Sequence, residues 1–133
     1  PMLSHDDDTI EKIDLIQALG IGACEFPITL EAARKAGDSG LHIFMGAPNL
    51  VRDRSTSGSL KASEVLGQDL CTGLVSDYYP ESLLQAAFLG KKHTQSPAAA
   101  LRQVTAGSRT GCYFERHPEH GQDPAGDDPS FRL

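Results

Sequence analysis

The sequence contains no tryptophan, 6% aromatic residues and three cysteines among 133 residues. No apolar run approaches the roughly 20 residues of a membrane-spanning helix, and no basic segment followed by an apolar one marks a signal peptide. Cys24, Cys71 and Cys112 form no C-x-x-C pair. Two of them lie in apolar runs, where cysteine behaves as a small buried hydrophobe. We therefore expect a soluble protein in a reducing, cytoplasmic setting.

Several common functional motifs are missing as well. The chain has no G-x-G-x-x-G, no G-x-S-x-G, no P-loop and no H-E-x-x-H. Its net charge of −6 comes without a basic stripe, which argues against nucleic-acid binding. A phosphorylated small molecule remains compatible with this balance, because a metal ion and one or two arginines can reverse the field inside a cleft.

What the sequence does contain is an alternation of short apolar runs and amphipathic segments. Apolar runs predict strands at residues 1–4, 21–26, 41–45 and 70–75, and the segments between and after them predict helices near residues 9–19, 30–36, 62–66 and 81–89. Thr9 or Asp8 is expected to cap the first helix, and Thr29 the second. The continuous apolar strands predict an α/β fold of parallel βα units.

Two other segments carry expectations of their own. Gly46 to Asn49 is expected to turn sharply out of the third strand, and residues 50–60 to form a long polar loop. In residues 91–133 we expect one helix, at 97–104, and then an irregular or disordered tail. The chain is therefore divided into a βα region, 1–90, and a second region, 91–133.

The predicted strands end in residues that can carry chemistry, at the position where α/β folds place their sites. His5 with Asp6, Asp7 and Asp8 is the densest group of metal-ligand types, and an imidazole with carboxylates suits Zn²⁺ or Mn²⁺. In the alternative interpretation Asp8 caps a helix and its neighbours favour the helix dipole. Asp77 also has a functional and a structural interpretation: it is a metal ligand or a proton acceptor, or it is a carboxylate flanking a helix.

Two further strand ends leave alternatives open. Glu25 is a base or a partner of a catalytic group, or it is held by the backbone amides of the next helix. The stretches Asn49–Arg52 and Ser55–Ser59 can clamp a phosphate through Arg52, hydroxyl groups and backbone amides, or they form an ordinary hydrophilic loop.

Taken together, the motifs resemble the phosphonate-metabolism members of the amidohydrolase superfamily. These are the diphosphatases of the carbon–phosphorus lyase pathway, which hydrolyse α-D-ribose 1-methylphosphonate 5-triphosphate. The resemblance lies in Ser4–Thr9, Glu25–Ala33, Met45–Arg52, Ser76–Pro80 and Ser82–Phe88, in the family's order. It covers roughly residues 4–89 and implies the carboxyl-terminal half of a (β/α)₈ barrel, so we expect a carboxyl-terminal fragment of such an enzyme.

The resemblance also implies a hydrolase that uses a divalent metal, Zn²⁺ or Mn²⁺. By this resemblance His5 and Asp77 are metal ligands, and Asp77 takes the proton of the attacking water. The residues that the resemblance assigns to the phosphorylated substrate are Asn49, Arg52, Ser57, Gly58 and Tyr78.

Some of the family's features do not occur here. The chain has no His-x-His pair, and it reads Ser-Thr-Ser-Gly-Ser at 55–59, where the family usually reads Ser-His-Ser-Gly-Asn. We therefore expect no turnover by the chain alone. Two alternatives stay open: another amidohydrolase reaction, on an amine or a cyclic amide, and a non-catalytic assembly module, a homo-oligomer in which a second copy completes the sheet.

Overall fold

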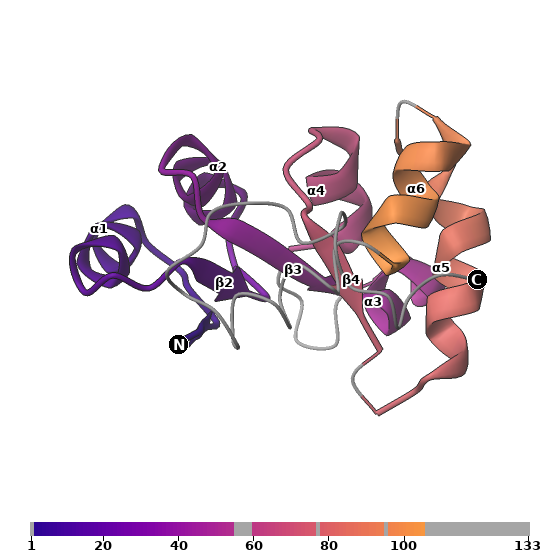
Figure 1. The fold of residues 1–133 in the computed structure, drawn as a ribbon, viewed down its shortest axis with the longest axis horizontal. Helices are drawn as coiled ribbons and strands as arrows, with labels where there is room; N and C mark the ends of the chain where they lie inside the picture. Colours follow the sequence, from indigo (N-terminus) through magenta and orange to yellow (C-terminus); the bar gives the residue numbers. More distant parts are fainter. Residues whose placement is uncertain (1, 55–59, 77, 95, 106–133) are drawn as a thin grey trace, which may run out of the picture.

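Four parallel strands alternate with helices in the part of the chain that the computed structural model describes, residues 2–54, 60–76, 78–94 and 96–105. The strands follow one another in the sheet in chain order, β1-β2-β3-β4, and each adjacent pair is parallel. Figure 1 shows α1, α2 and α4 in a row on one side of the sheet, with α5 and α6 beyond β4. The predicted α/β class with parallel βα units is confirmed.

The elements are short. The strands are β1 (Ser4–His5), β2 (Ala23–Glu25), β3 (His42–Gly46) and β4 (Gly73–Val75). The helices are α1 (Ile10–Ala18), α2 (Leu30–Asp38), α3 (Ala47–Arg52), α4 (Ala62–Gly67), α5 (Glu81–Gly90) and α6 (Pro97–Val104). No helix in the described ranges is long and apolar enough to cross a membrane.

The first two helices begin at threonine caps. Thr9 Oγ1 accepts a hydrogen bond from the Lys12 amide at 3.2 Å, and Thr29 Oγ1 accepts one from the Ala32 amide at 3.1 Å. Each cap satisfies one of the amides that a helix start leaves without an intrahelical partner. The prediction for Thr29 is confirmed, and of the two candidates for the first cap the structure uses Thr9.

The two faces of the sheet differ in character. Because registered residues of parallel strands share a face, Cys24, Ile43 and Leu74 lie on one side; all three are buried in the core under the helices. The other face carries a row across all four strands: His5, Glu25, Phe44 and Gly73. His5 and Glu25 therefore lie on the face away from the main core, whereas Ser4, in register with Cys24, lies on the core side.

The structure corrects the prediction for the segment after β3. The expected sharp turn at 46–49 and the start of the expected loop are instead helix α3. Pro48 is compatible with this helix because it lies in the first turn, where a missing amide hydrogen breaks no intrahelical bond. Residues 55–59 of the predicted loop lie outside the described residues.

Helix α6 was predicted at residues 97–104, and the structure confirms these bounds. It packs against α5, and the Gln103 side chain donates from Nε2 to the Cys71 carbonyl at 3.2 Å, just before β4. The described part of the region beyond residue 90 therefore lies against the sheet. The tail was predicted from Thr105 onward, and from residue 106 it lies outside the described residues.

Candidate functional site

The ends of β1 and β2 share a local construction. His5 and Glu25 are the last residues of their strands and are partners in the register. The next residue of each, Asp6 and Phe26, has a left-handed backbone, with φ of 55° and 54°. Such a conformation costs a non-glycine residue on the order of 1 kcal/mol or more, and it persists where the surrounding structure fixes it. The two tips are therefore held in place by the fold.

His5 lies between two carboxylates. Its Nδ1 is 3.0 Å from Asp6 Oδ2, and its Nε2 is 3.8 Å from Glu25 Oε2. The Phe26 ring meets the imidazole edge-on, with the centroids 5.2 Å apart. About half of the His5 side chain is exposed, so the ring is oriented by its neighbours and is still open to a ligand.

His5 and Glu25 are a pair of side chains of metal-ligand type that face each other. A hydrogen on Nδ1 points at the Asp6 carboxylate, which leaves a lone pair on Nε2 toward Glu25. An imidazole nitrogen and a carboxylate oxygen 3.8 Å apart are ligand types that one divalent ion can bridge. Two ligands of one tetrahedral zinc ion lie about 3.4 Å apart, given Zn–N and Zn–O distances near 2.1 Å. The pair fits a divalent metal after a small adjustment.

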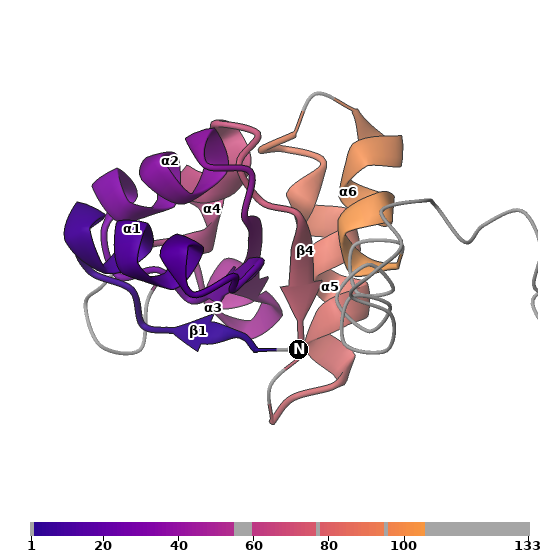
Figure 2. The same ribbon diagram turned by 60° about the vertical axis from the view of Figure 1, so that its left-hand side comes forward.

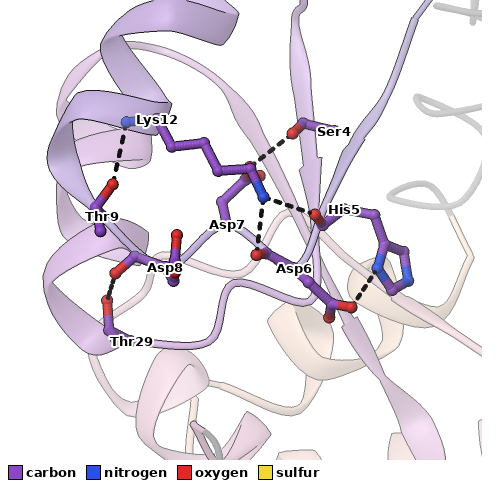
Figure 3. A network of polar contacts seen from close by, with 8 residues as sticks. All are labelled: Ser4, His5, Asp6, Asp7, Asp8, Thr9, Lys12 and Thr29. Atoms are coloured by element: carbon purple, nitrogen blue, oxygen red, sulfur yellow. Dashed lines mark hydrogen bonds and ion pairs between the residues drawn. The ribbon is translucent and has the colours of Figure 1, made fainter.

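The three aspartates after His5 have separate roles (Figure 3). Asp6 contacts His5, whereas the Asp7 side chain points inward and is fully buried. Asp7 Oδ1 accepts a hydrogen bond from Ser4 Oγ at 2.6 Å and lies 3.2 Å from Lys12 Nζ. The Asp8 carbonyl accepts a hydrogen bond from the Thr29 hydroxyl at 2.9 Å. Only Asp6 of the three stands beside the imidazole.

Lys12 is a residue that the sequence reasoning missed. Its ammonium group donates to the His5 carbonyl at 3.1 Å and to the Asp6 carbonyl at 2.9 Å, in addition to its contact with Asp7. It thereby fastens the first turn of α1 to the end of β1, as Figure 3 shows. The signal available in the sequence was the aspartate at position 7, since a buried carboxylate needs a positive partner nearby.

The two described cysteines are poor candidates for chemistry. Burial, a hydrogen bond to Asp7 and the charge of Asp7 raise the pKa of the Cys24 thiol far above its ordinary value. Burial raises the pKa of the Cys71 thiol to about 12. Because the thiolate is the reactive form, neither residue supplies a nucleophile at neutral pH.

Two of the residues expected at the substrate lie together on the same rim. Arg52 is the last residue of α3, and its Nη1 donates to the Tyr78 hydroxyl at 2.9 Å. The guanidinium carbon is 5.8 Å from the centroid of the Tyr78 ring. The contact joins the segment after β3 to the segment after β4. Three strand spacings, roughly 14 Å, separate β1, which carries His5, from β4, which precedes Tyr78.

The Asn49 side chain connects two helices through hydrogen bonds. Its Nδ2 donates to the Leu60 carbonyl at 3.2 Å, and its Oδ1 accepts from the Ala62 amide at 2.9 Å. The side chain thus ties α3 to the start of α4. Its predicted contact with substrate stays a prediction.

The other predicted site residues lie outside the described part of the chain. These are Asp77, Ser57 and Gly58. Among the residues that are described, no three His, Cys, Asp or Glu side chains are grouped closely enough to hold a metal ion. The predicted pairing of His5 with Asp77 at one metal is therefore untested, and Glu25 is the carboxylate that the structure places opposite His5 Nε2.

The chain is similar to a known enzyme. It is 47% identical over 87 residues to alpha-D-ribose 1-methylphosphonate 5-triphosphate diphosphatase of Escherichia coli (strain K12). The match takes in 65% of this chain but spans only 23% of the length of that enzyme. No family model and no solved structure matches the chain. The resemblance that the sequence motifs indicated is confirmed.

Proposed function

We propose that the chain is a metal- and phosphate-binding part of a hydrolase that releases diphosphate from α-D-ribose 1-methylphosphonate 5-triphosphate. The observation that carries the proposal is the 47% identity over 87 residues to the enzyme named for that reaction. The match covers 23% of the enzyme, so the reaction of the whole enzyme is assigned to this chain as a proposal. By the same argument the four parallel βα units correspond to half of an amidohydrolase-type barrel.

The metal-binding part of the proposal rests on the end of the sheet. His5 Nε2 and the Glu25 carboxylate, 3.8 Å apart, would hold a divalent ion such as Zn²⁺ or Mn²⁺, with Asp6 orienting the imidazole through Nδ1. A bound ion of this kind makes water a nucleophile near neutral pH. Asp77 is proposed as a further ligand and as the acceptor of the proton that this water loses.

The phosphate-binding part rests on the contact between Arg52 and Tyr78. Arg52 carries five N–H donors, of which the described hydrogen bond to Tyr78 uses one. The remaining donors match the oxygens of a phosphate, and Tyr78 holds the guanidinium in one place for them. Asn49, Ser57 and Gly58 are proposed to surround the same phosphate chain.

We assign no turnover to the chain alone. The hydrolytic site of the family needs a His-x-His pair, and this sequence has none. Of the proposed ligands within the described residues, His5 and Glu25 face each other, and two protein ligands are fewer than the three that catalytic zinc sites use. Metal-dependent release of diphosphate from a triphosphate by the purified chain, abolished in Asp77→Asn, would contradict this part.

The experiment that tests the proposal is a titration of the purified chain with a nucleoside triphosphate in the presence of Mn²⁺. We expect binding, and we expect Arg52→Ala to weaken it about tenfold, because a charge-assisted hydrogen bond contributes about 1.5–3 kcal/mol. The matched control is Arg34→Ala, whose exposed side chain contacts Gln68 away from the rim. An unchanged affinity in Arg52→Ala would favour the rival reactions on amines or cyclic amides.

A further inference from the structure

Exposed apolar side chains gather at the β1–α1 end of the sheet, which we call the acidic end (residues 2–20). Met2, Leu3, Leu15 and Leu19 have exposed fractions of 60%, 46%, 59% and 59%. Leu15 and Leu19 are four residues apart along α1 and so lie next to each other on its surface. Figure 1 shows α1 at one extreme of the molecule.

The opposite end of the sheet shows the same feature. In what we call the basic end (residues 78–105), Tyr78, Leu84, Phe88 and Leu101 have exposed fractions of 65%, 68%, 64% and 56%. Leu84 and Phe88 are again four residues apart, on α5. In the described part of the chain between these two ends no large apolar side chain is strongly exposed. Within the described residues, the strongly exposed large apolar side chains therefore belong to these two ends, whose helices, α1 at one end and α5 and α6 at the other, lie on opposite sides of the molecule in Figures 1 and 2.

The two ends carry opposite charge. In the acidic end Lys12 balances the buried Asp7, and the exposed Asp6, Asp8, Glu11 and Asp14 leave a net charge of −4. The basic end has Glu81 against Lys91, Lys92 and Arg102, a net charge of +2. Charges of opposite sign around apolar patches steer two surfaces together and oppose contact between like ends. The pattern favours contact between an acidic end and a basic end, and so between two copies of the chain.

On both outer edges of the sheet, backbone carbonyls accept hydrogen bonds from side chains. Lys12 Nζ donates a hydrogen bond to the His5 carbonyl on β1. Beside β4, Gln103 Nε2 donates a hydrogen bond to the Cys71 carbonyl, and the Cys71 thiol donates one to the Gly73 carbonyl at 3.2 Å. Such contacts protect an edge strand from pairing with another chain. Contact between copies through the helices is therefore favoured over completion of the sheet by strand pairing.

We infer that a second copy of the chain docks head to tail, with the α1 surface of one copy against the α5–α6 surface of the other. Each copy contributes four of the eight exposed side chains, at 46–68% exposure, as the apolar centre of a contact, and the surrounding polar surface supplies the rest of the roughly 800 Å² per partner that a stable interface buries. A head-to-tail contact closes into a ring or continues as a chain of copies, according to its rotation. This inference is independent of the proposed hydrolase function.

The test is the mass of the purified chain by analytical ultracentrifugation, over a range of concentrations at low and high salt. We expect mass to rise with concentration and association to weaken at high salt, since the charged surfaces are screened. Glu11→Lys should raise the dissociation constant about three- to tenfold. The matched control is Glu31→Lys, because both glutamates are exposed and hold the second position of their helices, α1 and α2; it should leave the association unchanged.

Two further variants locate the contact. Glu11→Lys combined with Lys91→Glu and Lys92→Glu in one chain leaves a net charge of −2 at each end, so association should weaken further than in Glu11→Lys alone. Leu84→Ser with Phe88→Ser should abolish it without loss of folding, since both side chains are exposed. A monomer at every concentration would overturn the inference. Equal effects of Glu11→Lys and Glu31→Lys would overturn the assignment of the surface.

Discussion

The ammonium group of Lys12 lies 3.2 Å from Asp7 Oδ1, and the Asp7 side chain is fully buried, whereas about a third of the Lys12 side chain is exposed. The same ammonium group donates hydrogen bonds to the carbonyls of His5 and Asp6. One partly exposed lysine thus neutralises a buried carboxylate and fixes the backbone around the candidate metal ligand. The site and the stability of the fold are coupled at this residue.

The first prediction concerns this pair. Lys12→Met should lower the free energy of unfolding by about 2–3 kcal/mol, because it leaves the Asp7 carboxylate buried without its positive partner. Urea denaturation measures the change. The control is Lys35→Met, which removes a pair with the more exposed Asp14 at 2.7 Å and should cost less than about 1 kcal/mol. Equal costs in the two variants would show that Asp7 does not depend on Lys12.

A second prediction concerns Asn49. Asn49→Ala should cost about 1–2 kcal/mol, because it removes a hydrogen bond to the Leu60 carbonyl and the bond that satisfies the Ala62 amide at the start of α4. Asn49→Asp keeps the acceptor for Ala62 and should cost less. Thermal or urea unfolding of the parent chain, Asn49→Ala and Asn49→Asp ranks their stabilities. If both variants are as stable as the parent chain, the link between α3 and α4 does not contribute.

His42 gives a prediction about pH. Burial lowers the pKa of His42 in the folded state below its ordinary value of 6.5. The unfolded chain therefore binds more protons than the folded chain as the pH falls through 6.5, and stability decreases, by at most about 1.4 kcal/mol per pH unit for one group. Denaturation between pH 7.5 and roughly pH 5.5 should show this slope, and His42→Gln should flatten it. His93→Gln, at an exposed position, should not.

The buried cysteines predict a labelling pattern. Cys24 and Cys71 are both buried, and burial raises the pKa of each thiol, to about 12 for Cys71. Neither should react with iodoacetamide at pH 8 in the native protein, and both should react in urea. Mass spectrometry of peptides from labelled protein distinguishes the two sites. Rapid native labelling of either cysteine would contradict the packing around β2 or β4.

Much of the fold could be predicted from local sequence. The apolar runs located the strands, Thr29 and Thr9 marked helix starts, and the bounds of α6 followed from the composition of residues 97–104. These features depend on neighbours in the sequence, so they are visible without tertiary contacts. Helix α3 was missed because Gly46 and Pro48 are also turn residues, and packing against α5 decides between the two structures.

The candidate site could be predicted only in part. The sequence pointed to His5 and to the acidic run after it, but it could not separate the three aspartates. Their separation depends on the left-handed backbone of Asp6, which turns Asp7 into the core toward Lys12. The meeting of Arg52 with Tyr78 depends on strands β3 and β4 being adjacent. Both are tertiary relationships that no local pattern carries.

The measurement that tests the central claim most directly is a thermal melt of the chain with a chelator and then with Zn²⁺ or Mn²⁺. Metal that binds the folded state should stabilise it by about 2.7 kcal/mol at a hundredfold excess over the dissociation constant. We predict a cooperative melt whose midpoint rises with metal, rises less in His5→Ala and in Asp77→Ala, and rises fully in the control His93→Ala. A melting midpoint that does not change when metal is added would contradict a metal site at the end of β1. So would a metal-induced shift in His5→Ala as large as that of the parent chain.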